Sequence, residues 1–425
     1  MKLDLKVDVH HLTRVEGHGN IHVKIRNGVV EEAAWEVVET PRFFEVMLKG
    51  RKWDEAGILT ARICGICSIG HTLASVRATE HAFGVEVPEV AQKLRMLAKH
   101  GETLSSHYLH LFFLAAPDFL GLPSVIPLVE SNPGIVAIAA RLKGNANRLC
   151  DLVAGRTTHP VSIHVGGMAM MPDQRKLLAF RDEMLRNLPD VLATIELFKT
   201  IELPDFARET EFVSLRGETN YPFIGGDLIS SDGFYKPESE YRSMTNEYVV
   251  DHSTSKWCKL SRNSFAVGAL ARVNNNYHLL HPEAVKVAEM FGLSPVNHNP
   301  FMNNIAQLVE CVHCTYESVA LIEEIAALPA TVKTKAAVKP IAGIGVGAVE
   351  VPRGILYHEY EYDKDGRVVK ANCIIPTTQN NANIYDDMGE LAKKFAVKGM
   401  TDSKLELLCS MLVRAYDPCI SCSVH

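Results

Sequence analysis

Two stretches of the chain begin with apolar and polar residues in alternation, which is typical of β-strands. The first covers residues 21–38 and contains the turn signal Asn27-Gly28. The second covers residues 357–375 and turns at Asp365-Gly366. The pattern therefore predicts two antiparallel hairpins, one early and one late in the chain.

Between the hairpins, the apolar positions recur with helical spacing. The longest such stretch covers residues 54–120, and Pro88 divides it into two segments. The same spacing recurs over residues 132–153, 173–200 and 300–328. Most of the chain is therefore predicted to be helical.

A last helix is predicted near the C-terminal end. Thr401 or Asp402 caps its start, and Asp417-Pro418 ends it after about Ala415. The predicted fold class is α+β, mainly helical, with a core of long helices and small peripheral β-sheets. Without repeats or a linker, residues 1–425 are predicted to form one unit, made of residues 1–50 (N-terminal β region), 54–330 (helical core), 335–400 (β-rich region) and 401–425 (last helix and tail).

Composition excludes several kinds of partner. The net charge is −6 and only 22% of residues are charged, without a basic stripe, so neither nucleic acid nor an anionic membrane is expected to bind. No apolar stretch reaches the roughly 18 residues of a membrane span, and the first residues lack the apolar segment of a secretory signal. Ten cysteines without such a signal favour thiolate ligands and free thiols over disulfides, which predicts a cytoplasmic location. An export signal on a partner chain is left open.

Two Cys-x-x-Cys pairs lie near opposite ends of the chain, at Cys64/Cys67 and Cys419/Cys422. Thiolates bind soft metals such as zinc, copper, iron or nickel. Zinc ribbons usually place their two pairs about 15 to 20 residues apart, so zinc is not the first choice here. The alternative is that all four thiols simply pack as small apolar groups.

Two other motifs carry less information. Cys311 and Cys314 share one face of a predicted helix, so we expect them to pack in the core, like Cys150, Cys258 and Cys409. The glycine-rich segment 343–348 lacks the third glycine of a dinucleotide fingerprint. We expect it to let the backbone pass close beneath Pro352 and Arg353, and we assign no nucleotide to it.

The segments around the outer cysteine pairs resemble the two metal-binding motifs of nickel-iron hydrogenase large subunits. Residues 62–71 read Arg-Ile-Cys-Gly-Ile-Cys-Ser-Ile-Gly-His, and residues 417–425 read Asp-Pro-Cys-Ile-Ser-Cys-Ser-Val-His. Further segments resemble the family in the same order along the chain: residues 13–18 (Thr-Arg-Val-Glu-Gly-His), 155–160 (Gly-Arg-Thr-Thr-His-Pro), 166–167 (Gly-Gly), 352–354 (Pro-Arg-Gly) and 376–378 (Pro-Thr-Thr). The resemblance covers nearly the whole chain and implies the fold of that subunit and an enzyme that cleaves dihydrogen reversibly.

The resemblance implies a nickel-iron centre held by the four thiolates. Cys64 and Cys419 match the terminal nickel ligands. Cys67 and Cys422 match the ligands that bridge nickel to an iron carrying carbon monoxide and cyanide. His71 falls where the family hydrogen-bonds a bridging sulfur, a contact that tunes sulfur basicity.

The resemblance also implies which residues surround the gas. Arg353 would lie above the metals, and Asp118 and Asp417 match the carboxylates that accompany this arginine. Pro352 and Thr377 match the pocket around the diatomic ligands of the iron.

Two residues compete for the role of base in heterolytic cleavage. The Cys419 thiolate could take the proton and pass it to Glu16, or the Arg353 guanidinium could act directly. An arginine keeps its proton because its pKa exceeds about 12. We therefore favour Cys419 and Glu16, with Arg353 positioning and polarising the gas.

A second cation is implied beside the centre. Glu45, His425 and the backbone carbonyl of Cys373 match the ligands of a magnesium-type ion, and oxygen ligands suit a hard cation. Many relatives read Arg-Gly-Phe-Glu where this chain reads Arg-Phe-Phe-Glu, but the carboxylate is kept. Family precursors lose an extension after the matching histidine, so the chain resembles a mature form, the alternative being a chain shortened by design.

Electrons need a way out, and no further cysteine group suits an iron-sulfur relay, so we expect no iron-sulfur cluster in this chain. The resemblance implies an iron-sulfur small subunit as partner. The motif style is closest to soluble multi-subunit members that carry further flavin and iron-sulfur subunits and act on NAD(P). A hydrogen sensor, a complex I-like subunit and a zinc-stapled structural subunit remain as alternatives, although the complex I relative lacks the four cysteines.

Overall fold

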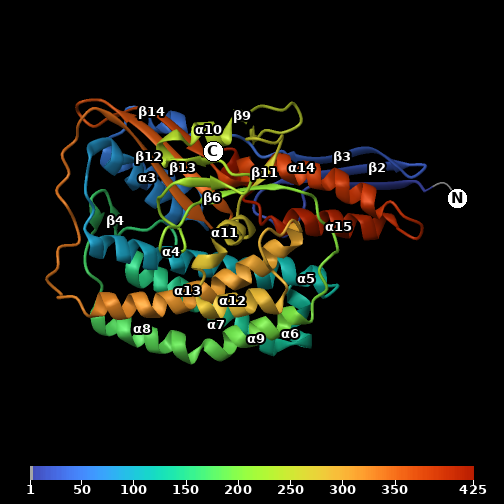
Figure 1. Cartoon of the computed structure of the whole chain (residues 1–425), viewed down its shortest axis with the longest axis horizontal. Coiled ribbons are helices and arrows are strands. Elements are labelled where there is room, and N and C mark those ends of the chain that lie inside the picture. The colour runs from blue at the N-terminus through green and yellow to red at the C-terminus, as the bar shows by residue number, and fades with distance from the viewer. Residues whose placement is uncertain (1–2) are drawn as a thin grey trace.

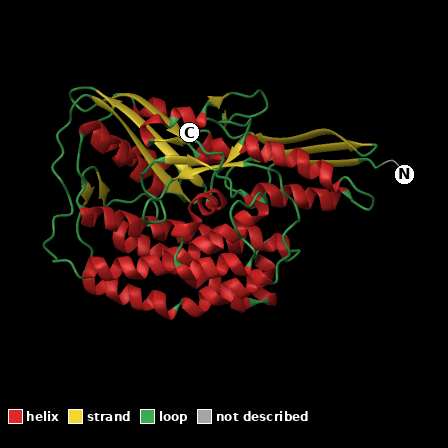
Figure 2. Ribbon diagram, viewed as in Figure 1, coloured by secondary structure: helices red, strands yellow, loops and turns green. Residues whose placement is uncertain are grey.

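The computed structural model describes residues 3–425, which form two layers (Figure 1). One layer is a bundle of long helices, and the other combines small β-sheets with further helices (Figure 2). The helices of the bundle are α4 (Glu89–Leu109), α5 (Ala116–Phe119), α6 (Ile126–Ser131), α7 (Pro133–Ala154), α8 (Gln174–Arg186), α9 (Leu188–Lys199), α12 (Pro282–Met290) and α13 (Asn303–Ala326).

The helical prediction is confirmed for this bundle, with two differences in detail. A π-helical turn at His110–Ala115 separates α4 from α5, so the segment after Pro88 is not one regular helix. The stretch 173–200 forms two helices because Asn187 ends α8 and Pro189 lies in the first turn of α9, where a missing N–H costs nothing. Helix α4 packs against both α7 and α13, which places it at the centre of the bundle.

The late hairpin is confirmed as β13 (Gly354–Tyr362) and β14 (Val368–Ile374), to which β12 (Gly343–Val351) adds a third antiparallel strand. Strand β12 lies on helix α3 (Ser68–Phe83). Its alternate glycines make this contact possible, because a Cβ on Gly345 would lie 2.0 Å from the Ala78 carbonyl oxygen. The glycines thus bring the strand against α3 and not, as we had expected, beneath Arg353. Helix α3 begins directly after Cys67.

The early hairpin is confirmed as β2 (Gly19–Arg26) and β3 (Val29–Val37), and an unpredicted strand β1 (Leu5–Val9) pairs with β2. Helices α14 (Pro376–Phe395) and α15 (Asp402–Ala415) pack on this sheet, and Thr401 caps α15 as predicted. Helix α14 lies in the region predicted to be β-rich. The first turns of α14 bury polar side chains, so their apolar residues do not recur with helical spacing. The buried polar residues of these turns are Thr377, Thr378, Gln379, Asn380, Asn381 and Asn383.

Short elements fill the space between the two layers. A four-stranded sheet has the order β11 (Phe265–Ala266), β6 (Glu211–Leu215), β7 (Leu228–Ser230) and β8 (Tyr235–Lys236), and β11 runs parallel to β6. The hydrophobic pattern did not predict this sheet, because its strands are too short to show a period. The remaining elements are α1 (Phe44–Leu48), α2 (Trp53–Thr60), β4 (Ile163–His164), β5 (Gly167–Met168), α10 (Arg242–Thr245), β9 (Glu247–Tyr248), β10 (Trp257–Cys258), α11 (Ala269–Asn276) and α16 (Ile420–Ser423). Within residues 3–425, no helix has the length and apolar character needed to cross a membrane.

Buried histidines in the bundle predict loss of stability in acid. Burial, together with nearby His313 and Lys99, lowers the pKa of His100 to about 3. In the unfolded chain His100 takes up a proton below about pH 6.5, whereas in the folded chain it stays neutral down to about pH 3. The free energy of unfolding therefore falls as the pH drops from 6.5 towards 3. Each pH unit in this range costs about 1.4 kcal/mol for such a histidine.

We expect His100→Asn to make the urea midpoint less dependent on pH between 6 and 5. Asparagine keeps a polar atom near the Ser318 hydroxyl, which lies 3.1 Å from His100 Nδ1, but does not titrate. The matched control is His278→Asn, because His278 is exposed and should leave the slope unchanged. An unchanged slope in His100→Asn would contradict the assignment.

Candidate metal centre

The four cysteines of the two outer pairs converge at one buried place. Their sulfur atoms all lie within 4.8 Å of one another, and Sγ of Cys64 is 3.6 Å from Sγ of Cys419. All four side chains are buried. Cys64 follows a short 3₁₀ turn, Cys67 precedes α3, and Cys419 and Cys422 lie at and within α16.

The surroundings stabilise negative charge on at least one sulfur. The backbone N–H groups of Ile66 and Cys67 each donate to Cys64 Sγ over 3.3 Å. Hydrogen bonds from the thiols of Cys419, Cys422 and Cys67 hold the pKa of Cys64 well below its usual value. Four buried sulfurs with one favoured thiolate are a donor set for soft metals.

Three contacts fix the C-terminal tail at this place. Thr377 Oγ1, in the first turn of α14, accepts a hydrogen bond of 2.9 Å from the Cys419 N–H. The Arg42 guanidinium donates to the carbonyls of Ile63 (2.8 Å) and Ser421 (2.6 Å), and so ties both cysteine segments together. Arg42 belongs to the Arg-Phe-Phe-Glu segment, but nothing in that segment indicated this role.

Glu16 contacts the cluster directly. Its Oε2 accepts from Cys419 Sγ at 3.2 Å and from the Ser421 N–H at 3.1 Å, and its Oε1 accepts from the Ser421 hydroxyl. The main chain holds it there, since Ile420 N–H donates to the Glu16 carbonyl over 2.9 Å. The neighbouring Gly17 permits this approach, because a Cβ there would lie 2.8 Å from Ser421 N.

Arg353 is buried and forms an ion pair with Asp417, with 2.8 Å between Nη2 and Oδ1. Burial alone would lower its pKa, but Asp417 and the cysteine sulfurs raise the pKa of Arg353 well above its ordinary value. Gln307 Nε2 donates to the other oxygen of Asp417 over 3.1 Å. Behind it, His110 Nδ1 lies 2.6 Å from Gln307 Oε1. Gln307 is buried in α13 and His110 in the π-helical turn after α4, and neither carried a sequence signal.

The expectation for Asp118 is wrong. Its carboxylate does not pair with Arg353 but accepts two hydrogen bonds of 2.9 Å from Arg414 and a further one from Arg14. Arg14 follows β1 and Arg414 lies in the last turn of α15, so both reach Asp118 from the side of the sheet. Asp118 therefore joins the N-terminal loop to α15 and does not anchor the arginine at the centre.

His71 lies on α3 and is fully buried. Its Nδ1 is 3.2 Å from His358 Nε2, and His358 Nδ1 is 2.6 Å from the Tyr360 hydroxyl. Among the described residues, His71 Nε2 finds no hydrogen-bond partner. Burial lowers the pKa of His71 to about 4, so the ring is neutral and keeps one nitrogen available for a group that the centre would bind.

A second cluster lies beside the first and contains Glu45, Cys373 and His425, whose ligand atoms lie within 4.8 Å of one another. The Cys373 N–H donates to Glu45 Oε1 over 2.7 Å, and His425 Nε2 lies 3.7 Å from the same oxygen. N–H and C=O of one residue in an antiparallel strand point to the same side, so the Cys373 carbonyl also points to this edge of β14. Its sulfur is part of the cluster as well, which sequence reasoning did not expect.

The other cysteines are buried and free, as expected. Burial raises the pKa of the Cys311 and Cys314 thiols well above the usual value, which fits apolar packing in α13. The Pro352 carbonyl accepts a hydrogen bond from Arg272 over 3.1 Å, a contact that the sequence did not indicate.

Comparisons with known proteins agree with this site. The family of nickel-dependent hydrogenases matches residues 42–132 and 229–425. The alpha subunit of sulfhydrogenase 1 from Pyrococcus furiosus is 35% identical over 100% of this chain and 98% of its own length. The beta subunit of the NAD-reducing hydrogenase HoxS from Cupriavidus necator is 27% identical over 99% of this chain and 94% of its own length.

A solved hydrogenase structure has the same fold as this chain. A crystal structure of an NAD+-reducing NiFe-hydrogenase in the H2-reduced state aligns with a TM-score of 0.88 and 28% identity, covering 99% of both chains. The sequence motifs, the convergent thiols and the matches over nearly the full length show that this chain belongs to the nickel-dependent hydrogenase family, as a hydrogenase large subunit.

Proposed function

We propose that this chain cleaves dihydrogen reversibly and heterolytically at a nickel-iron centre held by Cys64, Cys67, Cys419 and Cys422. The observation that carries the proposal is the buried cluster of four sulfurs with a carboxylate on one of them. The donors fit the centre: all are soft, and His71 Nε2 is left without a partner. Cys64 and Cys419 would hold nickel, and Cys67 and Cys422 would also hold an iron that carries carbon monoxide and cyanide.

When bound, the centre supplies an open coordination position that polarises dihydrogen as a Lewis acid. The protein then has to hold and remove a proton. Cys419 Sγ can hold it, and Glu16 Oε2 lies 3.2 Å away to receive it. The Ser421 hydroxyl on Glu16 Oε1 orients the carboxylate for this transfer.

Arg353 serves as a fixed positive charge rather than as a base. Asp417 and the sulfurs raise its pKa well above the ordinary value in spite of burial, so the guanidinium keeps its proton. A buried cation beside thiolates stabilises their negative charge and orients the gas. Pro352 and Thr377 would line the pocket for the iron ligands, since Thr377 contacts the Cys419 backbone.

We assign a structural magnesium-type ion to Glu45, His425 and the Cys373 carbonyl. Burial raises the pKa of the Cys373 thiol well above its usual value, so the sulfur stays protonated and offers little to a hard cation. The ion would hold His425, and with it the tail that carries Cys419 and Cys422.

Glu45→Ala is expected to lose this ion and to lower the unfolding midpoint. The variant also leaves the buried Cys373 N–H without its acceptor, which costs about 1 to 3 kcal/mol. Magnesium per chain and the thermal midpoint are the measurements, and Glu86→Ala, at an exposed carboxylate, is the control. A full complement of magnesium in Glu45→Ala would refute the assignment.

Electrons are proposed to pass to an iron-sulfur small subunit and onward through flavin to a soluble acceptor such as NAD(P). The support comes from the relatives, which are named as subunits, and from the NAD+-reducing hydrogenase of similar structure. A cytoplasmic location is part of this proposal, consistent with ten free thiols.

The decisive experiment purifies the native complex, counts nickel and iron per chain, and follows hydrogen-dependent reduction of a viologen dye and of NAD(P). We expect both metals, dye reduction, and infrared bands of metal-bound carbon monoxide and cyanide. Zinc in tetrahedral sulfur coordination without hydrogen-dependent activity would sink the proposal.

A further inference from the structure

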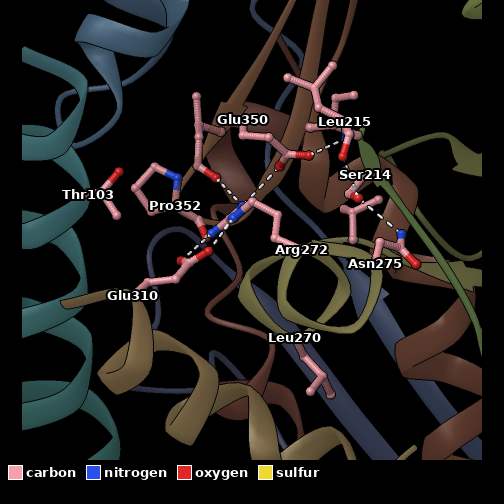
Figure 3. Close-up of polar contacts among 12 residues, drawn as sticks. Thr103, Ser214, Leu215, Leu270, Arg272, Asn275, Glu310, Glu350 and Pro352 are labelled. Carbon is pink, nitrogen blue, oxygen red and sulfur yellow. Dashed lines mark hydrogen bonds and ion pairs between the residues drawn. The ribbon is translucent and has the colours of Figure 1, made fainter. Parts of the chain in front are cut away.

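Arg272 is a buried arginine on helix α11 that contacts residues from several other elements (Figure 3). Its Nε and Nη2 donate to the two oxygens of Glu310 over 2.6 and 2.7 Å, and its Nη1 donates to Glu350 over 3.0 Å. The same Nη1 and Nη2 also donate to the carbonyls of Val351 (2.9 Å) and Pro352 (3.1 Å). All five N–H groups of the guanidinium are thus used, in the fixed planar geometry of that group.

Arg272 binds the carbonyls of Val351 and Pro352, the two residues immediately before Arg353 in the sequence. They lie at the end of β12, where the chain turns into β13, and Figure 3 shows the Arg272 guanidinium between Glu310, Glu350 and Pro352. The Arg353 head group itself makes few contacts. It pairs with Asp417 at 2.8 Å, lies 3.4 Å from the Ser106 hydroxyl, and its Nε finds no partner among the described residues. Where that head group lies therefore depends on where its backbone is held.

The acids that bind Arg272 are themselves fixed from other elements. Glu310 on α13 also accepts 2.7 Å hydrogen bonds from the Tyr221 hydroxyl and from His107 Nε2 on α4. Glu350 on β12 accepts from the Leu215 N–H of β6 over 2.8 Å. Burying such a set of charges rarely adds stability over apolar packing, so its use lies in geometry.

We propose that Arg272 is a positioning residue for the hydrogenase reaction: it clamps the backbone before Arg353 and thereby sets where the Arg353 guanidinium stands over the thiol cluster. The inference rests on the proposed role of Arg353 at the nickel-iron centre. A displacement of about 1 Å of a catalytic group can cost about 100-fold in rate.

Arg272→Lys, made in the complete complex, tests this directly. Lysine keeps the charge but cannot bridge Glu310 and two carbonyls at once. We expect kcat to fall about 10- to 100-fold, with KM for dihydrogen and nickel content unchanged. The infrared bands of carbon monoxide and cyanide should shift or broaden, because the Arg353 charge would move relative to the bound centre.

Arg95→Lys is the matched control. Arg95 is also buried, pairs with Glu80, and donates to the carbonyls of His164 (2.8 Å) and Gly167 (3.3 Å), but it does not touch the turn before Arg353. Its loss should lower the unfolding midpoint comparably and leave kcat and the infrared bands unchanged.

A double variant distinguishes a positioning role of Arg272 from a general loss of structure, because it shows whether the effects of two substitutions on kcat add up. If Arg272 acts through Arg353, Arg272→Lys should add little to a complex that already carries Arg353→Lys. Should Arg272→Lys not fold, Glu310→Gln is measured by the same criteria. Wild-type kcat and infrared bands in the folded variant, full additivity, or an equal loss of kcat in Arg95→Lys would each overturn the proposal. Absence of nickel and activity from the wild-type complex would instead reject the proposed function itself.

Discussion

Cys419→Ser is expected to abolish hydrogen-dependent dye reduction and to lower nickel per chain at least tenfold. A serine hydroxyl is a hard and almost always protonated group, whereas nickel prefers the soft thiolate. Cys419 also shares its buried cluster with three other sulfurs, which would bind the same metals. Loss of one ligand should therefore affect assembly of the whole centre and not only its rate.

The control for this substitution is Cys314→Ala. Cys314 is equally buried but lies on α13 outside the cluster, so its variant should keep nickel and lose only some stability. Metal analysis of both purified complexes decides the outcome. Nickel retained at the wild-type level in Cys419→Ser would show that the sulfur is not a ligand.

Glu16→Gln is expected to lower kcat by about 100- to 10,000-fold while nickel and iron remain bound. The amide can still accept a hydrogen bond from the Ser421 N–H, as Oε2 does now over 3.1 Å, but it cannot take up a proton. General acid–base groups contribute rate factors of this size. Exchange of deuterium gas with water protons should fall with turnover, because both require the same proton transfer.

Glu39→Gln provides the comparison. Glu39 lies close to the same loop and accepts a hydrogen bond from the His18 N–H over 2.9 Å, but the contacts of its carboxylate do not include a cysteine. We expect its kcat to stay near wild type. Normal turnover in Glu16→Gln would remove Glu16 from the mechanism and return Arg353 to consideration as the base.

The hairpins and long helices could be predicted because each carries its own periodicity. The region of α14 could not: its first turns bury Thr377 and a run of asparagines and glutamine, whose side chains bind backbone and hydroxyl groups from distant segments. The sheet that contains β6 and β11 depends on a parallel pairing of residues far apart in sequence. Local patterns do not encode such pairings.

At the centre, the cysteines that come together could be predicted from the sequence, and the contacts that support them could not. Cysteine pairs indicate metal binding by their residue type and spacing. The resemblance to the family added Glu16 and Arg353 to the predicted site. A carboxylate such as Asp118 can pair with any arginine that folding brings near, and Arg14 and Arg414 reached it. Arg272 and Gln307 are single polar residues within helices, and their contacts with other elements become visible only in the three-dimensional structure.

The origin of the cluster from two distant segments has a consequence for its assembly in time. A ribosome makes residues 64–67 early and residues 419–422 only when nearly the whole chain has been synthesised. The helical bundle can begin to fold meanwhile, since domains fold from the N-terminal side during synthesis. Cys64 and Cys67, just before α3, therefore remain without their two partner cysteines until the tail has been made. The pocket is complete only once the tail docks, because Cys419 and Cys422 supply two of its four sulfurs.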